Sequence, residues 1–336
     1  MEVTKNLSGD PRLGSTMEKG IDGDLILFGF PYDIGARRDY KGVGQEDAPD
    51  CTRRFLPKAG PLVNPEYGID ISKLVIRDYG NIWVSKTPTL EQLVDKLRAK
   101  VARARKGKGN SFVLGGTKEI VYPCVGGLHE HTGKGKIGLI LIHKTLDLNE
   151  FYDVDRVHMS CGTRKLLTED TSGERLKVVY LGVHPEYIHR ESKEFYEKNK
   201  DRITIIPWRE IAGRDVAISE KPDLNTLLTK GGSVFSEVLA DLSKECEEIH
   251  LSISLEAINS AYCPGVSHQL MMGGFSSEEI FEIILQAGKE RKVTSVDVTE
   301  YNHKVEDWIT GKIVANLFYY YAMGIATRVP QETASK

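Results

Sequence analysis

The stretch KIGLILIHKTLDLN, residues 136–149, decides the fold class, because it joins a buried strand to a cluster of polar side chains. Its first half is almost continuously apolar, which is typical of a strand that is covered on both faces of a sheet. His143, Thr145 and Asp147 follow at a spacing of two, so an extended chain places them on one face. Lys144 is expected on the other face. Polar residues at the carboxyl end of such a strand are typical of a site in an α/β protein.

The same pattern of an apolar strand followed by a helix repeats along the chain. Eight near-continuous apolar strands are predicted at 24–30, 73–80, 110–116, 136–142, 176–183, 201–208, 248–258 and 292–301. Helical periodicity is found at 89–106 with Thr89 as the N-cap, at 185–200, at 223–245 with an interruption at Gly231 and Gly232, at 276–290 and at 306–325. This order predicts a three-layer αβα fold with a central, mostly parallel sheet of about eight strands.

The organisation along the 336 residues favours one domain. Residues 1–20 are polar and unpatterned, and we expect them to form a flexible N-terminal tail. Residues 21–330 contain no Pro/Ser-rich linker and no internal repeat, so they are predicted to form a single α/β domain. With 40% hydrophobic and 28% charged residues, the composition is that of a chain that buries a sizeable core.

Charge and cysteine content exclude several classes of protein. The net charge of -3, from 45 basic and 48 acidic residues, argues against a non-specific nucleic-acid binder. Five scattered cysteines without a CxxC pair argue against a disulfide framework and indicate free thiols in a reducing compartment. The first residues lack the apolar region of a secretory signal, and the longest apolar stretch is too short to cross a bilayer. We therefore expect a cytoplasmic protein without membrane partners.

Polar segments follow four of the predicted strands, and their order is informative. GGTKE (115–119) follows the third strand and HKTLD (143–147) follows the fourth. The seventh strand carries Ser252, Ser254 and Glu256 on one face, and the eighth is followed by Glu300. Because the carboxyl ends of parallel strands lie at one edge of a sheet, these segments are expected to form one site.

These segments, in this order, resemble the ureohydrolase family, which includes arginase, agmatinase and formiminoglutamase. The resemblance is nearest to the formiminoglutamase branch and runs from GFPYDIG (29–35), similar to its G-x-P-x-D-x-G, to the closing helix. GGTKE is similar to the family's GGGHE, CGT (161–163) to SGT, and CPGVS (263–267) to aPGVS. The resemblance implies an arginase-like fold, a homotrimer, and a pocket for a small molecule whose specificity comes from loops such as 181–190.

The resemblance also implies two Mn²⁺ ions that bind and deprotonate a water, which attacks a guanidinium or formimino carbon. The family's ligands come from GG(D/G)H, DAHxD and SxDxD. In this chain they fall, in order, on Lys118, on His143, Thr145 and Asp147, and on Ser254 and Glu256. Asp147 alone matches the family's ligand type, Glu256 is a longer carboxylate, and the other four positions are altered.

The altered positions lead to a prediction of a lost metal site. A protonated lysine is a donor and not a ligand, so Lys118 is expected to replace the metal and to pair with Asp147 and Glu256. From this we predict a pseudoenzyme without a manganese cofactor. It would not hydrolyse arginine, agmatine or formiminoglutamate, and would serve in ligand binding, scaffolding or regulation.

An alternative keeps the activity. In it the chain is an active amidine or guanidine C–N hydrolase with a residual single-metal site at His143, Asp147 and Glu256. Vestigial catalytic candidates are Glu300, at the position of the family's substrate-contacting acid, Cys161, where formiminoglutamases have Ser, and His158. A third interpretation is an unrelated activity of Cys161 or Lys118.

Overall fold

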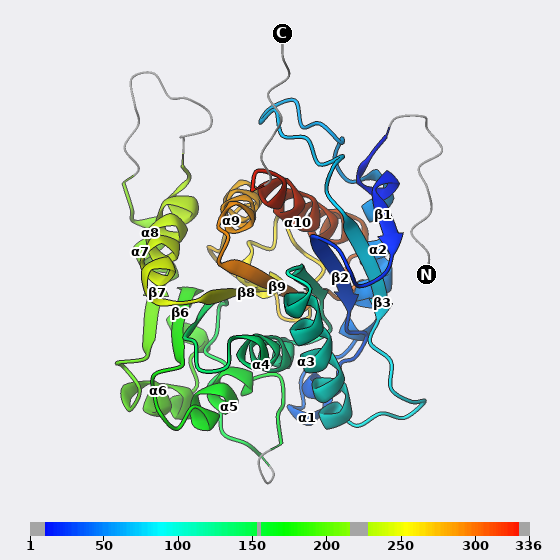
Figure 1. The fold of residues 1–336 in the computed structure, drawn as a ribbon. Helices are drawn as coiled ribbons and strands as arrows, with labels where there is room; N and C mark the ends of the chain where they lie inside the picture. The colour runs from blue at the N-terminus through cyan, green and yellow to red at the C-terminus, as the bar shows by residue number, and fades with distance from the viewer. Residues whose placement is uncertain (1–10, 153–155, 216–227, 329–336) are drawn as a thin grey trace.

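The computed structural model describes residues 11–152, 156–215 and 228–328, and a single nine-stranded sheet crosses them (Figure 1). In spatial order the strands are β1 (Met17–Lys19), β3 (Ile76–Asn81), β2 (Leu25–Gly29), β4 (Asn110–Leu114), β9 (Val293–Thr299), β8 (Glu248–Ser254), β5 (Ile137–Ile142), β6 (Leu176–Val183) and β7 (Ile203–Pro207). Every neighbouring pair is parallel. The predicted three-layer fold with a parallel sheet is confirmed, with one strand more than expected.

Helices cover both faces of this sheet, as Figure 1 shows for α9 and α10 on one side and α3 and α4 on the other. The long helices are α3 (Leu90–Lys106), α4 (Val121–Thr132), α8 (Lys230–Glu245), α9 (Ser277–Lys289) and α10 (Trp308–Ala326). Successive residues of a strand feed the two layers in turn. Leu139 and Leu141 of β5 pack in the cluster with α3 and α4, whereas Ile140 and Ile142 pack in the cluster with α9 and α10. This alternation explains the unbroken apolar run in the sequence.

Five shorter helices complete the described part of the chain. They are α1 (Ile34–Arg38), α2 (Ala48–Arg53), α5 (Gly162–Glu169), α6 (Arg190–Glu197) and α7 (Trp208–Ala212). The helix predicted at 185–200 is shorter in the structure, because a 3-10 turn at Pro185–Tyr187 ends in extended backbone at Ile188. Among these residues no helix has the length and apolar character needed to cross a membrane.

Two local predictions at helix starts have different outcomes. Thr89 is the N-cap of α3 as predicted, and with Gln92 it forms a capping box. The interruption expected at Gly231 and Gly232 is wrong, because both residues lie in the first turn of α8 behind the N-cap Thr229. A Cβ on Gly232 would lie 2.3 Å from the Glu282 carboxylate of α9, so the glycine allows α8 to approach its neighbour. Residues 223–227 of that predicted helix lie outside the described residues.

Residues 11–20, the second half of the segment predicted as a flexible tail, contain regular structure. Residues 17–19 form β1, which pairs with β3 at the edge of the sheet, and a 3-10 turn at Leu13–Ser15 packs Leu13 into the core. A strand of three residues with one partner has too few apolar positions to produce a periodic signal.

The order of the central strands explains where a site can form. β4, β9, β8 and β5 are consecutive neighbours, and all four end at the same edge of the sheet. The polar segments that follow them in the sequence therefore meet above four adjacent strands.

Candidate functional site

A cavity of about 550 Å³ opens at the carboxyl edge of the sheet. Residues from segments far apart in the sequence line it, namely Lys41, Lys118, Lys144, Thr145, Leu146, Asn149, Met159, Ser160, Glu186, Tyr187, Ile188, His189, Glu256, His268, Gln269 and Met271. Four of them come from the loop at 181–190, where specificity was expected. A concave site with a few convergent polar groups is the usual form of a small-molecule pocket.

Lys118 is the central cation of this cavity. Its Nζ lies 3.1 Å from Asp147 Oδ1 and 3.8 Å from Glu256 Oε2, and its side chain is only 4% exposed. It also donates to the Thr145 hydroxyl at 3.1 Å. Burial alone would lower the pKa of Lys118, but the carboxylates of Asp147 and Glu256 raise it well above its usual range. The side chain is therefore a buried ammonium ion.

Asp147 is held from two sides. Its Oδ2 lies 2.5 Å from His143 Nδ1, while Oδ1 faces Lys118. Although burial would raise the pKa of Asp147, Lys118 and His143 together lower it. His143 Nε2 lies 3.1 Å from the Ser252 hydroxyl, whose proton goes to Asp297 Oδ1 at 2.8 Å. Both ring nitrogens of His143 are therefore engaged by neighbouring side chains.

Glu300 contacts the backbone of Lys118. Its carboxyl accepts hydrogen bonds from the backbone N–H of Lys118 and from Gln45 Nε2, each at 3.1 Å. Burial and the nearby Glu256 carboxylate raise the pKa of Glu300 well above its usual range. Its backbone φ of 72° lies in the left-handed region, which is uncommon for a residue with a Cβ.

His268 is a site residue that the sequence did not single out. Its Nδ1 lies 3.0 Å from Glu256 Oε1, and the side chain is 40% exposed to the cavity. The pKa of Glu256, which burial alone would raise, is lowered by Lys118, by His268 and by Lys144. His268 lies in the long loop that follows β8, so neither strand periodicity nor motif spacing indicated it.

The prediction that Lys144 points away from the site is wrong, because its side chain lines the cavity. Its Nζ lies 3.9 Å from Glu256 Oε2, donates to the backbone carbonyl of His268 and lies over the ring of Tyr187. Alternation fails here because β5 ends at Ile142 and the chain then turns. Burial lowers the pKa of Lys144, although Glu256 opposes the shift.

Three other predicted candidates, Cys161, His158 and Ser254, do not line the cavity. Cys161 is fully buried at the start of α5, where its Sγ accepts from the backbone N–H of His158 at 3.1 Å. Burial would lower the pKa of His158, but the Asp39 carboxylate, whose Oδ1 lies 3.4 Å from Nδ1 of the ring, raises it to about 10. The Ser254 hydroxyl is buried without a hydrogen-bond partner. Neither Cys161 nor His158 is among the residues that line the cavity.

The six positions carried over from the family do not fit a dimanganese cluster. The ammonium of Lys118 fills the space between Asp147 and Glu256, and it would repel a dication at ligand distance. His143 directs its two ring nitrogens at Asp147 and Ser252, so neither nitrogen points into open space where a metal could bind.

Comparison with known proteins identifies the family. The model of the arginase family matches residues 23–324, which is most of the chain. The chain belongs to the arginase family. It is 24% identical over 300 residues to a formimidoylglutamase of Salmonella heidelberg, covering 89% of this chain and 84% of that protein.

Solved structures agree with this assignment. The crystal structure of Trypanosoma cruzi formiminoglutamase with Mn²⁺ superimposes with a TM-score of 0.81 at 26% identity, covering 95% of this chain and 99% of that one. Formimidoylglutamase from Bacillus subtilis gives a TM-score of 0.80 at 15% identity, covering 96% and 95% of the two chains, which shows a common fold. The arginase-like fold and the resemblance to the formiminoglutamase branch are confirmed.

Two predictions are corrected by these findings. The expectation of a pseudoenzyme is overturned, because the similar proteins are formiminoglutamases and the family is one of hydrolases. These findings favour the alternative, an active hydrolase. The expectation of no metal cofactor is overturned as well, because the Trypanosoma cruzi structure carries Mn²⁺ and the described residues contain a group that could hold a metal ion. That group is Cys124, His250 and Asp297, and it lies outside the six predicted positions.

Proposed function

We propose that this chain hydrolyses a C–N bond of a linear amidine or guanidine, with formiminoglutamate as the first substrate to test. Membership of the arginase family and the similarity to formimidoylglutamases support the reaction class. The observation that carries the proposal is the cavity at the carboxyl edge, in which an imidazole and a carboxylate form a dyad beside buried cations. The substrate is small enough for a cavity of about 550 Å³.

In this proposal the dyad of Glu256 and His268 activates water. The Glu256 carboxylate accepts from Nδ1 of His268, which leaves Nε2 of the exposed ring as a proton acceptor. Water that loses a proton to Nε2 attacks the amidine carbon and forms a tetrahedral intermediate. The imidazolium then returns the proton to the substituted nitrogen, so that the C–N bond to this nitrogen breaks, the amine of the substrate departs, and the amidine carbon leaves as an amide or as urea.

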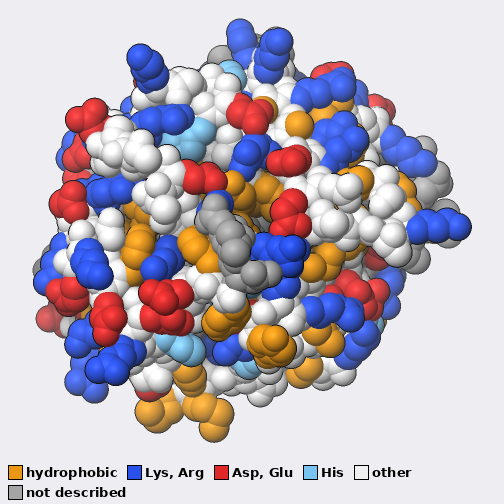
Figure 2. Space-filling view, turned by 90° about the horizontal axis from the view of Figure 1, so that it is seen from below, with side chains coloured by type: hydrophobic (Ala, Val, Ile, Leu, Met, Phe, Trp, Pro, Cys, Tyr) orange, Lys and Arg blue, Asp and Glu red, His pale blue; other side chains and the backbone are white. Residues whose placement is uncertain are grey.

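Charged groups that line the cavity orient the substrate. Lys41 and Lys144 line the cavity and can pair with the carboxylates of an acidic substrate such as formiminoglutamate. Lys118 is already neutralised by Asp147 and Glu256, so its contribution is to hold these two side chains in place. Figure 2 shows that basic and acidic side chains are interspersed on one face of the molecule, so a polyanion would meet both signs of charge there.

Substrate assays with matched variants test the proposal. The purified protein is assayed with formiminoglutamate, agmatine and arginine, with and without added Mn²⁺, by the release of glutamate from the first compound and of urea from the other two. His268→Ala is expected to lower the turnover about 10²–10⁴-fold, the usual contribution of a general base. The control is His131→Ala, because His131 contacts Glu248 at the amino end of β8, at the opposite edge of the sheet. No hydrolysis of any of the three compounds, or equal rates in both variants, would contradict the proposal.

The oligomeric state of the chain is tested separately from its activity. A homotrimer is implied by the family resemblance and stays a prediction, which light scattering after size-exclusion chromatography would test.

A further inference from the structure

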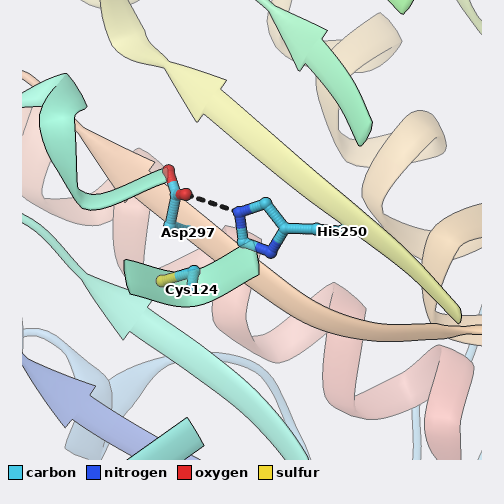
Figure 3. A group of neighbouring side chains, drawn as sticks. All are labelled: Cys124, His250 and Asp297. Atoms are coloured by element: carbon cyan, nitrogen blue, oxygen red, sulfur yellow. Dashed lines mark hydrogen bonds and ion pairs between the residues drawn. The ribbon is translucent and has the colours of Figure 1, made fainter. Parts of the chain in front are cut away.

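We propose that Cys124, His250 and Asp297 form a buried site for one zinc-like divalent ion. The three side chains come from α4, β8 and β9, and each is fully buried. One ligand atom of each lies within 4.8 Å of the others, and Figure 3 shows the three side chains as neighbours, with the His250 ring directed at the Asp297 carboxylate. A tetrahedral ion with bonds of 2.0–2.3 Å holds its ligand atoms about 3.3–3.8 Å apart. His250 Nε2 and Asp297 Oδ2, which are 2.7 Å apart, would therefore separate by about 0.6 Å, and the other ligand atoms, which lie within 4.8 Å, would approach by about 1.5 Å at most.

The tertiary structure brings this group together through strand pairing. β8 and β9 are parallel neighbours, with Ser252 opposite Asp297 in the register. His250 and Ser252 lie two residues apart on β8, so both side chains face the same layer of helices. α4 packs on this layer and contributes Cys124.

The immediate surroundings are those of a metal ligand set. Ser252 donates to Asp297 Oδ1 at 2.8 Å, which fixes the carboxylate and leaves Oδ2 facing His250 Nε2 at 2.7 Å. A hydrogen bond from outside the ligand set commonly orients a metal-binding carboxylate in this way. An ion bound together with Asp297 would take Nε2 of His250, the ring nitrogen that faces the carboxylate, in place of the proton that the two side chains share.

The donor set selects the class of ion. A thiolate, an imidazole and a carboxylate suit Zn²⁺ and related borderline-soft ions, whereas Mg²⁺ and Ca²⁺ prefer oxygen ligands alone. A dication bound by the Cys124 thiolate and the Asp297 carboxylate has no net charge, which a fully buried site requires. Three protein ligands leave one tetrahedral position that the group does not fill.

The site is distinct from the cavity but connected to it. The Ser252 hydroxyl that holds Asp297 also lies 3.1 Å from Nε2 of His143, and His143 contacts Asp147 beside Lys118. An ion at the buried group would therefore lie behind the wall of the cavity, one hydrogen-bonded serine away from it. It would occupy none of the six positions carried over from the family's cage.

Metal analysis of the intact chain tests the proposal. The protein is incubated with excess Zn²⁺, desalted and analysed for bound metal, and a second sample is loaded with Co²⁺. We expect about one ion per chain, and a thiolate-to-cobalt charge-transfer band in the Co²⁺ sample. Cys124→Ser should abolish the band and most of the bound metal. Cys51→Ser is the matched control, because Cys51 is also buried but lies on α2, outside the group.

A second measurement, on the wild-type protein, tests the proposal if Cys124→Ser does not fold. X-ray absorption of the zinc-loaded wild-type protein should then show one sulfur at about 2.3 Å together with lighter ligands at about 2.0–2.2 Å. Less than about a tenth of an ion per chain, or a bound ion with only nitrogen and oxygen neighbours, would overturn the proposal. A Co²⁺ band that persists in Cys124→Ser would also overturn it.

Discussion

Replacing Lys118 by methionine removes the ammonium that holds two buried carboxylates, and the cost can be worked from the structure. At an effective dielectric constant of about 20, its separations of 3.1 Å from Asp147 and 3.8 Å from Glu256 correspond to attractions of about 5 and about 4 kcal/mol. Desolvation of the three charges offsets much of this attraction, and breaking a buried pair typically costs about 3–5 kcal/mol. We expect Lys118→Met to lower the free energy of unfolding by that amount at pH 7.

The loss of stability in Lys118→Met should depend on pH. In the wild type, Lys118 lowers the pKa values of Asp147 and Glu256 against the effect of burial. Without the ammonium, burial raises both pKa values above those of the unfolded chain, which are about 3.9 for Asp and about 4.3 for Glu. A carboxyl group whose pKa is higher in the folded than in the unfolded chain lowers the free energy of unfolding when the pH is high enough to ionise it in the unfolded chain. The deficit of Lys118→Met relative to the wild type should therefore be largest near neutral pH and should shrink as the pH falls.

Urea unfolding of wild type and variant at pH 7 and at pH 5 measures both effects. Lys244→Met is the matched control, because that side chain is 74% exposed and pairs with Asp241 on the surface of α8, where a change within about 0.5 kcal/mol is expected. In the double variant Lys118→Met/Asp147→Asn, the cost should be smaller than the sum of the single costs by about 1–3 kcal/mol. A Lys118→Met deficit below about 1 kcal/mol at pH 7, or one that does not narrow at pH 5, would refute the reasoning.

Three local contacts lead to further testable predictions. Thr89→Ala removes the N-cap of α3 and should cost about 1 kcal/mol in thermal or urea unfolding. The imidazole of His158, whose pKa the hydrogen bond with Asp39 raises to about 10, should show no titration by NMR between pH 6 and 8. Its contribution to stability is complete below pH 6.5 and is lost as the pH rises through 10. Glu300→Gln should gain stability relative to the wild type between pH 5 and pH 8, because the raised pKa of Glu300 penalises its ionisation.

Much of the fold could be predicted from the sequence, because both faces of the strands are buried. A strand such as β5 needs apolar residues at every position, and this produces an unbroken run that is easy to recognise. β1 could not be predicted, since three residues at the sheet edge carry no such pattern. The start of α3 could be predicted because a capping box involves only residues three apart, Thr89 and Gln92.

The candidate site was predictable only in part. The order of the polar segments after the strands indicated Lys118, Asp147 and Glu256, and the structure brings these three side chains into contact. His268 lies on a loop, and its contact with Glu256 depends on the path of that loop over the strand ends. Lys144 points into the cavity because the chain turns after Ile142, which alternation along a strand does not describe.

The sequence by itself determined the layered α/β fold and the edge of the sheet at which the polar segments collect, because both follow from local patterns of apolar and polar residues. Only the tertiary structure decided which of these polar groups meet. Cys124, His250 and Asp297 are far apart in the chain, and they converge through the pairing of β8 with β9 and the packing of α4. Such contacts depend on register and on helix placement, which are properties of the whole packed core and not of any segment.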